Sequence, residues 1–395
     1  MRVGEAAKQS GDDSHSENRE TDFHRRRRAR ILMPITLRCN AVDKTNRSRE
    51  APMPEILSVA WQAGTPLPPA SIAAVQRAAA TLAGGGLVAV PTETVYGLAA
   101  VATDADAVAK IFAAKGRPAS NPLIVHVADA EAARALAASW PDTAARCAAR
   151  YWPGPLTIVL PAAAVVPEIV RAGGETVALR CPEHPVTASL LRILGRPLAA
   201  PSANRSGAIS PTTAAHVAAS LGDAVDLILD GGSCDRGIES TVLDLTDELP
   251  RVLRPGPVSR SAVEAALGCT VGGPGGRTPA GRSPGLLPKH YAPRAQLEVV
   301  AASTERVGER LRQGVEVGWL TCGSLDGGPL ADGSRSGRLH RIDLPAEADS
   351  YARSLYAALH QLDAAGVDCI IVERPPQEEA WQAIHDRLTR ASRRE

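Results

Sequence analysis

The sequence predicts an α/β protein with a larger domain, a linker and a smaller domain. The chain has 395 residues, which is enough for two or three domains with sizeable cores. Short apolar, partly β-branched segments alternate with amphipathic segments, as expected when strands and helices follow one another. A stretch rich in Gly, Pro and Arg at 272–284 interrupts this alternation and is expected to be a linker.

The first predicted domain covers residues 71–267. Its strands are expected where apolar residues run between turn residues. Such segments lie at 87–90, 123–127, 157–160, 177–180, 227–229 and 241–245. Helices are expected at 104–114, 184–194 and 212–221, because apolar residues recur there at helical spacing. Thr212 is the expected N-cap of the last of these helices.

The second predicted domain covers residues 295–392 and repeats the alternation on a smaller scale. Strands are expected at 297–300, 317–320 and 369–372, and helices at 304–312, 346–365 and from Glu378. In the long helix an apolar stripe should face the core; it consists of Ala352, Leu355, Tyr356, Leu359 and Leu362. The segment 268–294 between the domains is predicted to be a linker or lid.

Residues 1–55 are predicted to be disordered. They are polar, carry a run of arginines at 25–28 and show no sustained periodicity. Two alternatives stay open: a basic tail that contacts RNA weakly, or a translation start at Met33 or Met53 that would leave most of this segment outside the protein.

The composition argues against several classes of protein. The net charge is +1 and aromatic residues make up 3%, so the chain as a whole is neither a polybasic nucleic-acid binder nor a base-stacking platform. No apolar run reaches the roughly 20 residues that a membrane span needs. The cysteines are odd in number, widely spaced and never in a C-x-x-C pair. That spacing favours reduced thiols in a cytoplasmic protein over a zinc site or a disulfide framework.

The sequence lacks the P-loop pattern G-x-x-x-x-G-K-[ST], the H-E-x-x-H pattern and the G-x-S-x-G elbow. Phosphate chemistry would therefore need another anion cradle. A first candidate is the segment 91–98, in which Glu93 and Thr94 follow a predicted buried strand. Ligands bind at that end of strands in α/β sheets, whereas an ordinary loop with threonine caps is the alternative.

A second candidate lies at the end of the first predicted helix. Lys115 and Arg117 flank a glycine there, and Asn121 and His126 follow. A compact ammonium beside a planar guanidinium suits a polyphosphate, and Lys115 is one of few lysines in an arginine-rich chain. Capping of the helix C-terminus is the alternative for the cations. His126 taken alone is more typical of a core histidine.

The remaining polar motifs are spread along the rest of the chain. The loop 200–213 offers backbone N–H groups and hydroxyls before a helix, a suitable arrangement for an anion. Short motifs follow at 230–232, 237–242 and 253–256. His290 and Tyr291 stand in a stretch that otherwise reads as a spacer, which favours a segment that docks over a site.

Together these segments resemble the YrdC-like threonylcarbamoyl-AMP synthase family, in its long form with an additional C-terminal domain. The resemblance covers residues 71–259 and 283–294, and more weakly 296–391. It implies a YrdC-like twisted mixed sheet with surrounding helices around a basic cavity, and a smaller Rossmann-like C-terminal α/β domain. It also implies a nucleotidyltransferase that converts L-threonine, bicarbonate or CO2 and ATP to threonylcarbamoyl-AMP and pyrophosphate, for modification of tRNA beside the anticodon.

The resemblance also implies the site residues. Those expected at L-threonine are Thr94, His126, Arg180, Ala200 and Ser240, with Arg180 as a bidentate partner of the carboxylate. Those expected at ATP are Lys115, Arg117, Asn121, Thr176, Ser202, Asn204, Ser210, Arg254 and Tyr291. Lys115, Arg117 and Arg254 would act in catalysis by offsetting phosphate charge as pyrophosphate leaves.

No dedicated metal site is expected. Mg²⁺ should accompany ATP and be held mainly by phosphate oxygens and water, with Glu93 and Glu239 as the only candidate protein ligands. The expected partners are the downstream proteins that transfer the threonylcarbamoyl group to tRNA.

Two other functions stay open. A non-catalytic RNA-binding or ribosome-assembly module would use the basic cavity and the arginine-rich tail, but it would not require Thr94, Arg180 and Ser240. A carbamoyltransferase of the hydrogenase-maturation type shares the YrdC-like domain, but it carries zinc-finger cysteine pairs that this sequence lacks. The oligomeric state and the role of the second domain are left open by the sequence.

Overall fold

The computed structural model describes residues 54–273, 290–324 and 337–393. All of them belong to one compact unit, Glu50–Glu395. The expectations for residues 1–53, with their arginine run and the two internal methionines, lie outside the described residues. So does most of the predicted linker or lid, at 274–289.

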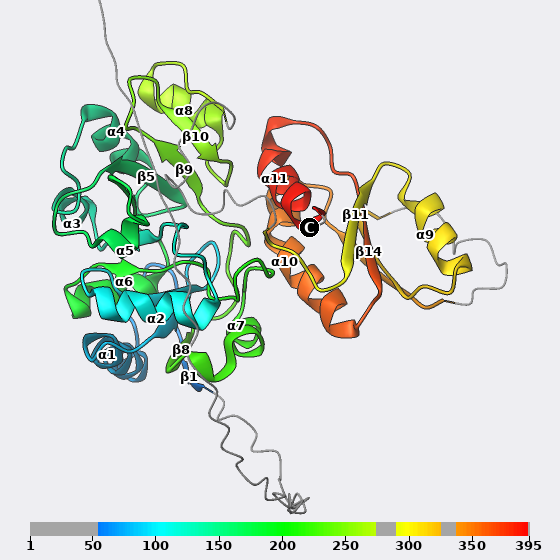
Figure 1. Cartoon of the computed structure of the whole chain (residues 1–395), viewed down its shortest axis with the longest axis horizontal. Helices are drawn as coiled ribbons and strands as arrows, with labels where there is room; N and C mark the ends of the chain where they lie inside the picture. The colour runs from blue at the N-terminus through cyan, green and yellow to red at the C-terminus, as the bar shows by residue number, and fades with distance from the viewer. Residues whose placement is uncertain (1–53, 274–289, 325–336, 394–395) are drawn as a thin grey trace, which may run out of the picture. The chain divides into compact units, whose positions relative to one another are not determined.

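The N-terminal domain, residues 54–273, is built on a mixed sheet of ten strands (Figure 1). The strand order is β1-β8-β2-β3-β7-β4-β6-β5-β9-β10. β4 and β6 are parallel neighbours, whereas β2 and β3 are antiparallel, so the expected mixed sheet is confirmed. The strands are β1 Glu55–Ser58, β2 Val88–Val90, β3 Gly97–Val101, β4 Ile124–His126, β5 Leu156–Pro161, β6 Thr176–Arg180, β7 Leu198–Ala199, β8 Leu227–Asp230, β9 Thr241–Asp244 and β10 Arg251–Arg254.

Four of these strands were not predicted, and each has a local reason. β1 pairs with β8 from Glu55 onward, so ordered structure begins before the expected boundary at residue 71 and includes the last residue of the segment expected to be disordered. β3 is rich in alanine and glycine, and β7 has only two residues. β10 begins and ends with arginine, so its two apolar residues are too few to be recognised as a buried strand. These four segments form strands because they pair with neighbouring strands in the sheet, since their own β-propensity is weak.

Helices surround this sheet (Figure 1). They are α1 Pro69–Ala83, α2 Ala105–Lys115, α3 Ala130–Arg134, α4 Asp142–Tyr151, α5 Glu168–Arg171, α6 Pro185–Leu194, α7 Ala214–Leu221, the short 3₁₀ helix η1 Gly222–Ala224, and α8 Arg260–Leu267. Asp104 caps α2 by accepting the N–H of Ala107, and Gly116 ends the helix in the left-handed region with φ of 59°. α7 is capped by Thr213 rather than by the predicted Thr212, because the Thr213 hydroxyl accepts the N–H of His216.

The apolar core of this domain lies on both faces of the sheet. In one cluster Val108 and Ile111 of α2 pack with Leu98 of β3. In the other, Val75 of α1 and Leu190 of α6 pack with Val88 of β2. The strands between the two clusters are buried on both faces, and polar side chains are left to the strand ends and loops.

The C-terminal domain, residues 294–393, has a four-stranded parallel sheet in the order β11-β14-β12-β13. Its elements are β11 Gln296–Val300, α9 Ser303–Arg312, β12 Val317–Cys322, β13 Leu339–Leu344, α10 Ala348–Ala365, β14 Cys369–Glu373, the 3₁₀ helix η2 Glu379–Trp381 and α11 Gln382–Ala391. The smaller α/β domain is thus confirmed, with β13 as an added strand. The predicted stripe on α10 is buried, from Ala352 to Leu362.

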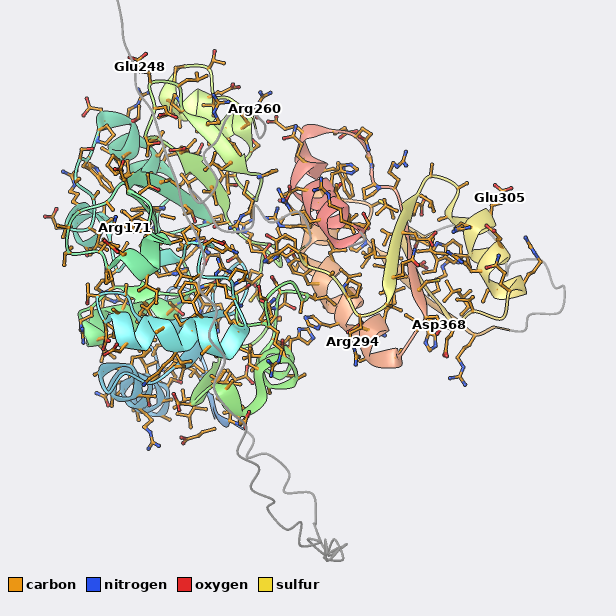
Figure 2. The ribbon with its side chains drawn as sticks, in the orientation of Figure 1. Arg171, Glu248, Arg260, Arg294, Glu305 and Asp368 are labelled. Atoms are coloured by element: carbon orange, nitrogen blue, oxygen red, sulfur yellow. The ribbon has the colours of Figure 1, made fainter. Side chains whose placement is uncertain are left out.

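The outside of the molecule carries charges of both signs. Figure 2 shows Glu248 and Arg260 at the outside of the N-terminal domain, and Glu305 and Asp368 on the C-terminal domain; all four are exposed. In the described part of the chain, no helix combines the length and apolar character that crossing a bilayer requires.

Candidate active site

Loops that are far apart in the sequence, from Thr92 to Tyr291, meet in one pocket of the N-terminal domain. Its walls come from the β2–β3 loop with Thr94, from His126 and Arg180 at the ends of β4 and β6, and from Arg254 at the end of β10. The further described residues that line it are Thr92, Val95, Gly97, Arg117, Ile124, Ala200, Pro201, Ser202, Glu239, Ser240, His290 and Tyr291. Nine of the residues predicted from the sequence therefore line one pocket.

The pocket is almost filled by protein. Its free volume is about 40 Å³, which is room for only a few waters. His290 and Tyr291 are both buried in it, and Tyr291 has a left-handed backbone with φ of 64°. A substrate the size of an amino acid or a nucleotide therefore requires these side chains to move. A larger cavity of about 640 Å³, lined partly by 235–236 and 377–380, contains none of the predicted site residues.

Three buried cations lie in or beside the pocket: Arg117 and Arg254 line it, and Lys115 is buried near Arg117. The Lys115 ammonium donates to the carbonyls of Ser202 and Asn204. Arg117 donates to the carbonyls of Asn121 and Pro122, at 3.1 and 2.8 Å. These partners are all neutral, and burial lowers the pKa of Lys115 and brings that of Arg117 to about 10.

Arg254 is the third cation. Its Nε and Nη2 donate to the Ser240 carbonyl at 3.1 and 3.0 Å, and Nη2 also reaches the Ser240 hydroxyl at 3.2 Å. Among the described residues, no carboxylate forms an ion pair with Lys115, Arg117 or Arg254. Buried positive charges without a counterion favour a multiply charged anion, because it would offset their desolvation.

The loop that carries Arg254 passes unusually close to the start of β9. A Cβ on Gly256 would lie 2.3 Å from the backbone nitrogen of Thr241, so only glycine permits this approach. The close approach is what lets Arg254 reach both oxygens of Ser240.

The opposite side of the pocket has small hydroxyls and a histidine. The Thr94 hydroxyl lies 2.9 Å from that of Thr92, and the Ser240 hydroxyl lies 2.7 Å from that of Thr157. Neither ring nitrogen of His126 has a hydrogen-bond partner in the described part of the chain. Burial, and then the charge of Arg180, hold the pKa of His126 well below its ordinary value, so the ring is neutral.

Arg180 differs from the expectation of a free bidentate clamp. Its Nη2 forms an ion pair of 2.6 Å with Glu93, and its Nε donates to the Gly154 carbonyl at 3.2 Å. The second Glu93 oxygen accepts the N–H of Glu183. Two of the three guanidinium nitrogens thus have partners among the described residues, which leaves both N–H groups of Nη1 and the second N–H of Nη2 for a carboxylate.

Besides Lys115, four predicted residues lie outside the pocket lining. Asn121 and Asn204 are buried, and each has one side-chain atom without a partner among the described residues, Nδ2 and Oδ1 respectively. Ser210 donates to Glu239 at 2.5 Å rather than pointing into the pocket. Thr176 begins β6 while Arg180 ends it, so the two lie about 13 Å apart along the strand at ~3.3 Å per residue.

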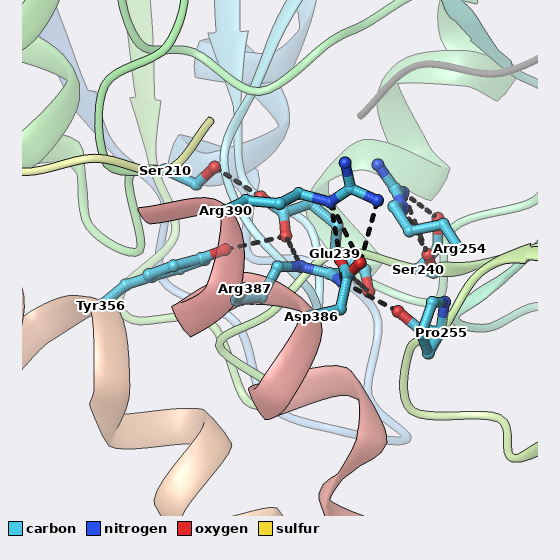
Figure 3. Close-up of polar contacts among 9 residues, drawn as sticks. All are labelled: Ser210, Glu239, Ser240, Arg254, Pro255, Tyr356, Asp386, Arg387 and Arg390. Atoms are coloured by element: carbon cyan, nitrogen blue, oxygen red, sulfur yellow. Dashed lines mark hydrogen bonds and ion pairs between the residues drawn. The ribbon is translucent and has the colours of Figure 1, made fainter. Parts of the chain in front are cut away.

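Glu239 is the residue whose role the sequence did not predict. Its carboxylate accepts hydrogen bonds from Ser210, from Tyr356 at 3.0 Å and from Arg387 at 2.8 Å (Figure 3). Although burial acts against its charge, Arg387 and Arg254 bring the pKa of Glu239 to about 2. Because Glu239 directly precedes Ser240, the sequence could have placed it at the site. Arg387 lies 148 residues away, and nothing in the sequence around it indicates that it contacts Glu239.

Comparison with known proteins places the chain in a family. A family model described as "Telomere recombination" matches residues 80–256, and one described as "Threonylcarbamoyl-AMP synthase, C-terminal domain" matches residues 258–393. A threonylcarbamoyl-AMP synthase of Pyrococcus abyssi is 40% identical over 80% of this chain and 94% of its own length. One from Bacillus subtilis is 42% identical over 80% of this chain and 92% of its own length.

A solved structure agrees with these matches. The crystal structure of P. abyssi Sua5 complexed with L-threonine has a TM-score of 0.76 and 38% identity, and covers 85% of this chain and 97% of that one. The two domains and their pocket therefore define a nucleotidyltransferase. The chain belongs to the Sua5/YrdC family of threonylcarbamoyl-AMP synthases, in the long form with the Sua5 C-terminal domain. Its activity is the synthesis of threonylcarbamoyl-AMP, which serves the modification of tRNA.

Proposed function

We propose that the pocket around Ser240 binds L-threonine and ATP side by side and joins them with bicarbonate or CO2. The observation that carries this proposal is the set of three buried cations that form no ion pair among the described residues, next to a small polar end that carries hydroxyls and a neutral histidine. The cationic side suits the triphosphate, and the polar side suits an amino acid of the size of threonine.

The reaction needs no protein nucleophile. The threonine amine adds to CO2, which forms a carbamate and releases a proton. A carbamate oxygen then attacks the α-phosphorus of ATP in line, and the bond from that phosphorus to the bridging oxygen breaks as pyrophosphate leaves with the electron pair. Catalysis then consists of positioning and charge stabilisation, as in other phosphoryl-group transfers.

Each side chain has a proposed role in this scheme. Lys115, Arg117 and Arg254 offset the charge that moves onto the leaving pyrophosphate. Arg180 uses Nη1 for the threonine carboxylate, while Glu93 holds its other side. Thr94 and Ser240 face the substrate hydroxyl, His126 accepts from the amine, and Ala200 contributes backbone. The nucleotide side also includes Asn121, Ser202, Asn204 and Tyr291. Thr176 and Ser210 do not line the pocket, so they would affect the nucleotide only through residues that do.

Mg²⁺ is proposed to arrive with ATP. No cluster of three potential metal-binding side chains occurs within 54–273, 290–324 and 337–393. Glu93 and Glu239, the two candidate carboxylates, are already engaged by Arg180 and Arg387 respectively. These donors do not fit a protein-built magnesium cage, so the phosphate oxygens and water would hold the ion.

The test is an assay of pyrophosphate and adenylate with the purified full chain. Threonine, bicarbonate and ATP together should give both products, and omission of threonine or bicarbonate should abolish the adenylate. ATP turnover without threonine would contradict the proposed arrangement. RNA binding without adenylate formation would favour the alternative of a non-catalytic RNA-binding module. Added proteins that transfer the threonylcarbamoyl group to tRNA should consume the adenylate.

A further inference from the structure

Arg387 belongs to α11 of the C-terminal domain, yet most of its contacts are to groups at the pocket. It is the largest fully buried side chain among the described residues. Its Nε donates to the Glu239 carboxylate at 2.8 Å, Nη2 to the Glu239 carbonyl at 3.3 Å, and Nη1 to the Pro255 carbonyl at 3.0 Å. Within its own domain, the Arg387 Nη1 also pairs with Asp386 at 2.8 Å. Figure 3 shows this arrangement.

These contacts hold the backbone on both sides of a pair of site residues. Glu239 directly precedes Ser240, and Pro255 directly follows Arg254. Arg254 itself donates to the carbonyl and hydroxyl of Ser240. One guanidinium from the C-terminal domain thus fixes the two chain segments whose side chains meet at the centre of the pocket.

The contact also controls where the negative charge of Glu239 lies relative to Arg254. Glu239 is the only acidic residue among those described as lining the pocket. Arg387 and Arg254 both act on its carboxylate, but within the described ranges only Arg387 forms an ion pair with it. Besides Arg387, Arg254 is the cation whose charge acts on Glu239, so without Arg387 the carboxylate would be drawn toward Arg254. A carboxylate on Arg254 would compete with the phosphates of ATP for the same donor.

Two aromatic residues complete the contact. The Arg387 guanidinium lies 5.2 Å from the centre of the Tyr291 ring, and Tyr356 of α10 both donates to Glu239 and lies 5.9 Å from Tyr291. A cation over an aromatic face is attractive, so Arg387 also holds the ring that occupies the pocket.

We propose that Arg387 is a positioning residue for the nucleotide side of the site, through which the C-terminal domain keeps Glu239 away from Arg254 and so leaves Arg254 free for phosphate. The proposal rests on the assignment of Arg254 to ATP made above. It gives the C-terminal domain a direct part in ATP affinity, and it places that part in a single buried contact.

The experiment compares R387M, E239Q and the double variant R387M/E239Q in the full chain, with KM for ATP and for threonine measured separately. R387M should raise KM for ATP about tenfold or more, with less than about a threefold change for threonine. E239Q should change KM for ATP little, because it removes the competing charge. The double variant should restore KM for ATP to within about threefold of the unmodified chain, since no carboxylate is left to occupy Arg254.

Two further variants complete the test: Y356F weakens the same contact if R387M folds poorly, and R306M is the control. Y356F removes one hydrogen bond to Glu239 and keeps the ring, so KM for ATP should rise by a smaller factor in the same direction. R306M is the matched control, since Arg306 pairs with Glu298 at 2.8 Å within the C-terminal domain and should leave both KM values unchanged.

The outcomes separate the two proposals. The inference is wrong, and Arg387 has only a structural role, if R387M raises both KM values equally. The same conclusion follows if KM for ATP in R387M/E239Q stays as high as in R387M. If Y356F leaves KM for ATP unaltered, the coupling through Glu239 is absent. If K115M and R254M also leave KM for ATP unchanged, the assignment of the nucleotide side itself fails.

Discussion

Arg254 donates to both the carbonyl and the hydroxyl of Ser240, at 3.0 and 3.2 Å from Nη2. The pair joins the two sides of the pocket, because Arg254 lies among the cations and Ser240 among the hydroxyls. A change at either residue should therefore affect both substrates, whereas changes further from this pair should separate them.

Lys115 offers the cleanest test on the nucleotide side. Lys115→Met should lower the rate roughly 30-fold or more and raise KM for ATP, since loss of a desolvated charge contact costs about 2–5 kcal/mol. Some loss of thermal stability is also expected, because the ammonium holds the carbonyls of Ser202 and Asn204. Steady-state pyrophosphate release measures the first effect and thermal unfolding the second.

Lys110 is the matched control for that change. It lies on the same helix, but it is exposed and donates to the Gly85 carbonyl at 2.6 Å. Lys110→Met should leave both KM values as they are. Turnover near that of the unmodified chain in Lys115→Met would remove Lys115 from the site.

Arg180 should affect threonine far more than ATP. Arg180→Lys keeps a positive charge beside Glu93 but gives up the planar fork, so KM for threonine should rise about tenfold or more. KM for ATP should change by less than about threefold. Removing the charge outright would leave Glu93 buried and unpaired at a cost of about 3–5 kcal/mol, which is why lysine is the better choice. Equal changes in both KM values would show that Arg180 does not bind threonine.

The sequence predicted most of the core strands and the residues that line the pocket, because their signals are local. Apolar runs mark β2, β4, β5, β6, β8 and β9, and the motifs that follow them lie at the sheet edge where ligands bind. β13 was missed because its residues, Leu339–Leu344, show neither the apolar run of a buried strand nor a regular alternation, since His340 and Arg341 stand together.

Long-range electrostatic partners could not be predicted in the same way. Arg180 and Glu93 each lie in a recognisable motif 87 residues apart, but nothing in either motif says that they pair. Arg387 lies in a helix that reads as an ordinary amphipathic surface helix, and its partner Glu239 is in the other domain. The first pair depends on how distant strands are ordered within one sheet, and the second on how the two domains meet; both are properties of the whole fold rather than of any segment.

A stacked pair of histidines predicts acid sensitivity. His216 of α7 and His360 of α10 lie with ring centres 3.9 Å apart, and His360 donates to the Ser210 carbonyl at 3.1 Å. Burial, and then His360, bring the pKa of His216 to about 4, while burial also lowers that of His360 despite the nearby Asp363. In the unfolded chain each ring should titrate at about 6.5.

The sign follows from which state binds more protons. As the pH falls below 6.5, and down to about 4 for His216, the unfolded chain takes up protons that the folded histidines do not, so stability should fall with the pH. The double variant H216Q/H360Q should lose less of its melting temperature on acidification than the unmodified chain. H340Q serves as the control, since His340 lies outside the stack and pairs with Glu316. An acid-induced loss identical in all three proteins would contradict a role for the stack.

Tyr291 should act through its hydroxyl as well as its ring. The ring is buried in the pocket, its Oη has no partner among the described residues, and the next residue, Ala292, donates to the Gly207 carbonyl at 2.9 Å. A buried phenol without a partner is costly, so a ligand that supplies an acceptor would be favoured. Tyr291→Phe should therefore fold at least as stably as the unmodified chain while KM for ATP rises about threefold to tenfold.

Tyr291→Ala should raise KM for ATP further, because it opens the pocket to water. The same opening should speed hydrolysis of the bound adenylate, a mixed anhydride. The measurements are KM for ATP and the lifetime of adenylate in a single-turnover reaction. A Tyr291→Phe protein with unchanged KM for ATP, together with an unchanged adenylate lifetime in Tyr291→Ala, would show that the residue only fills the pocket when no substrate is bound.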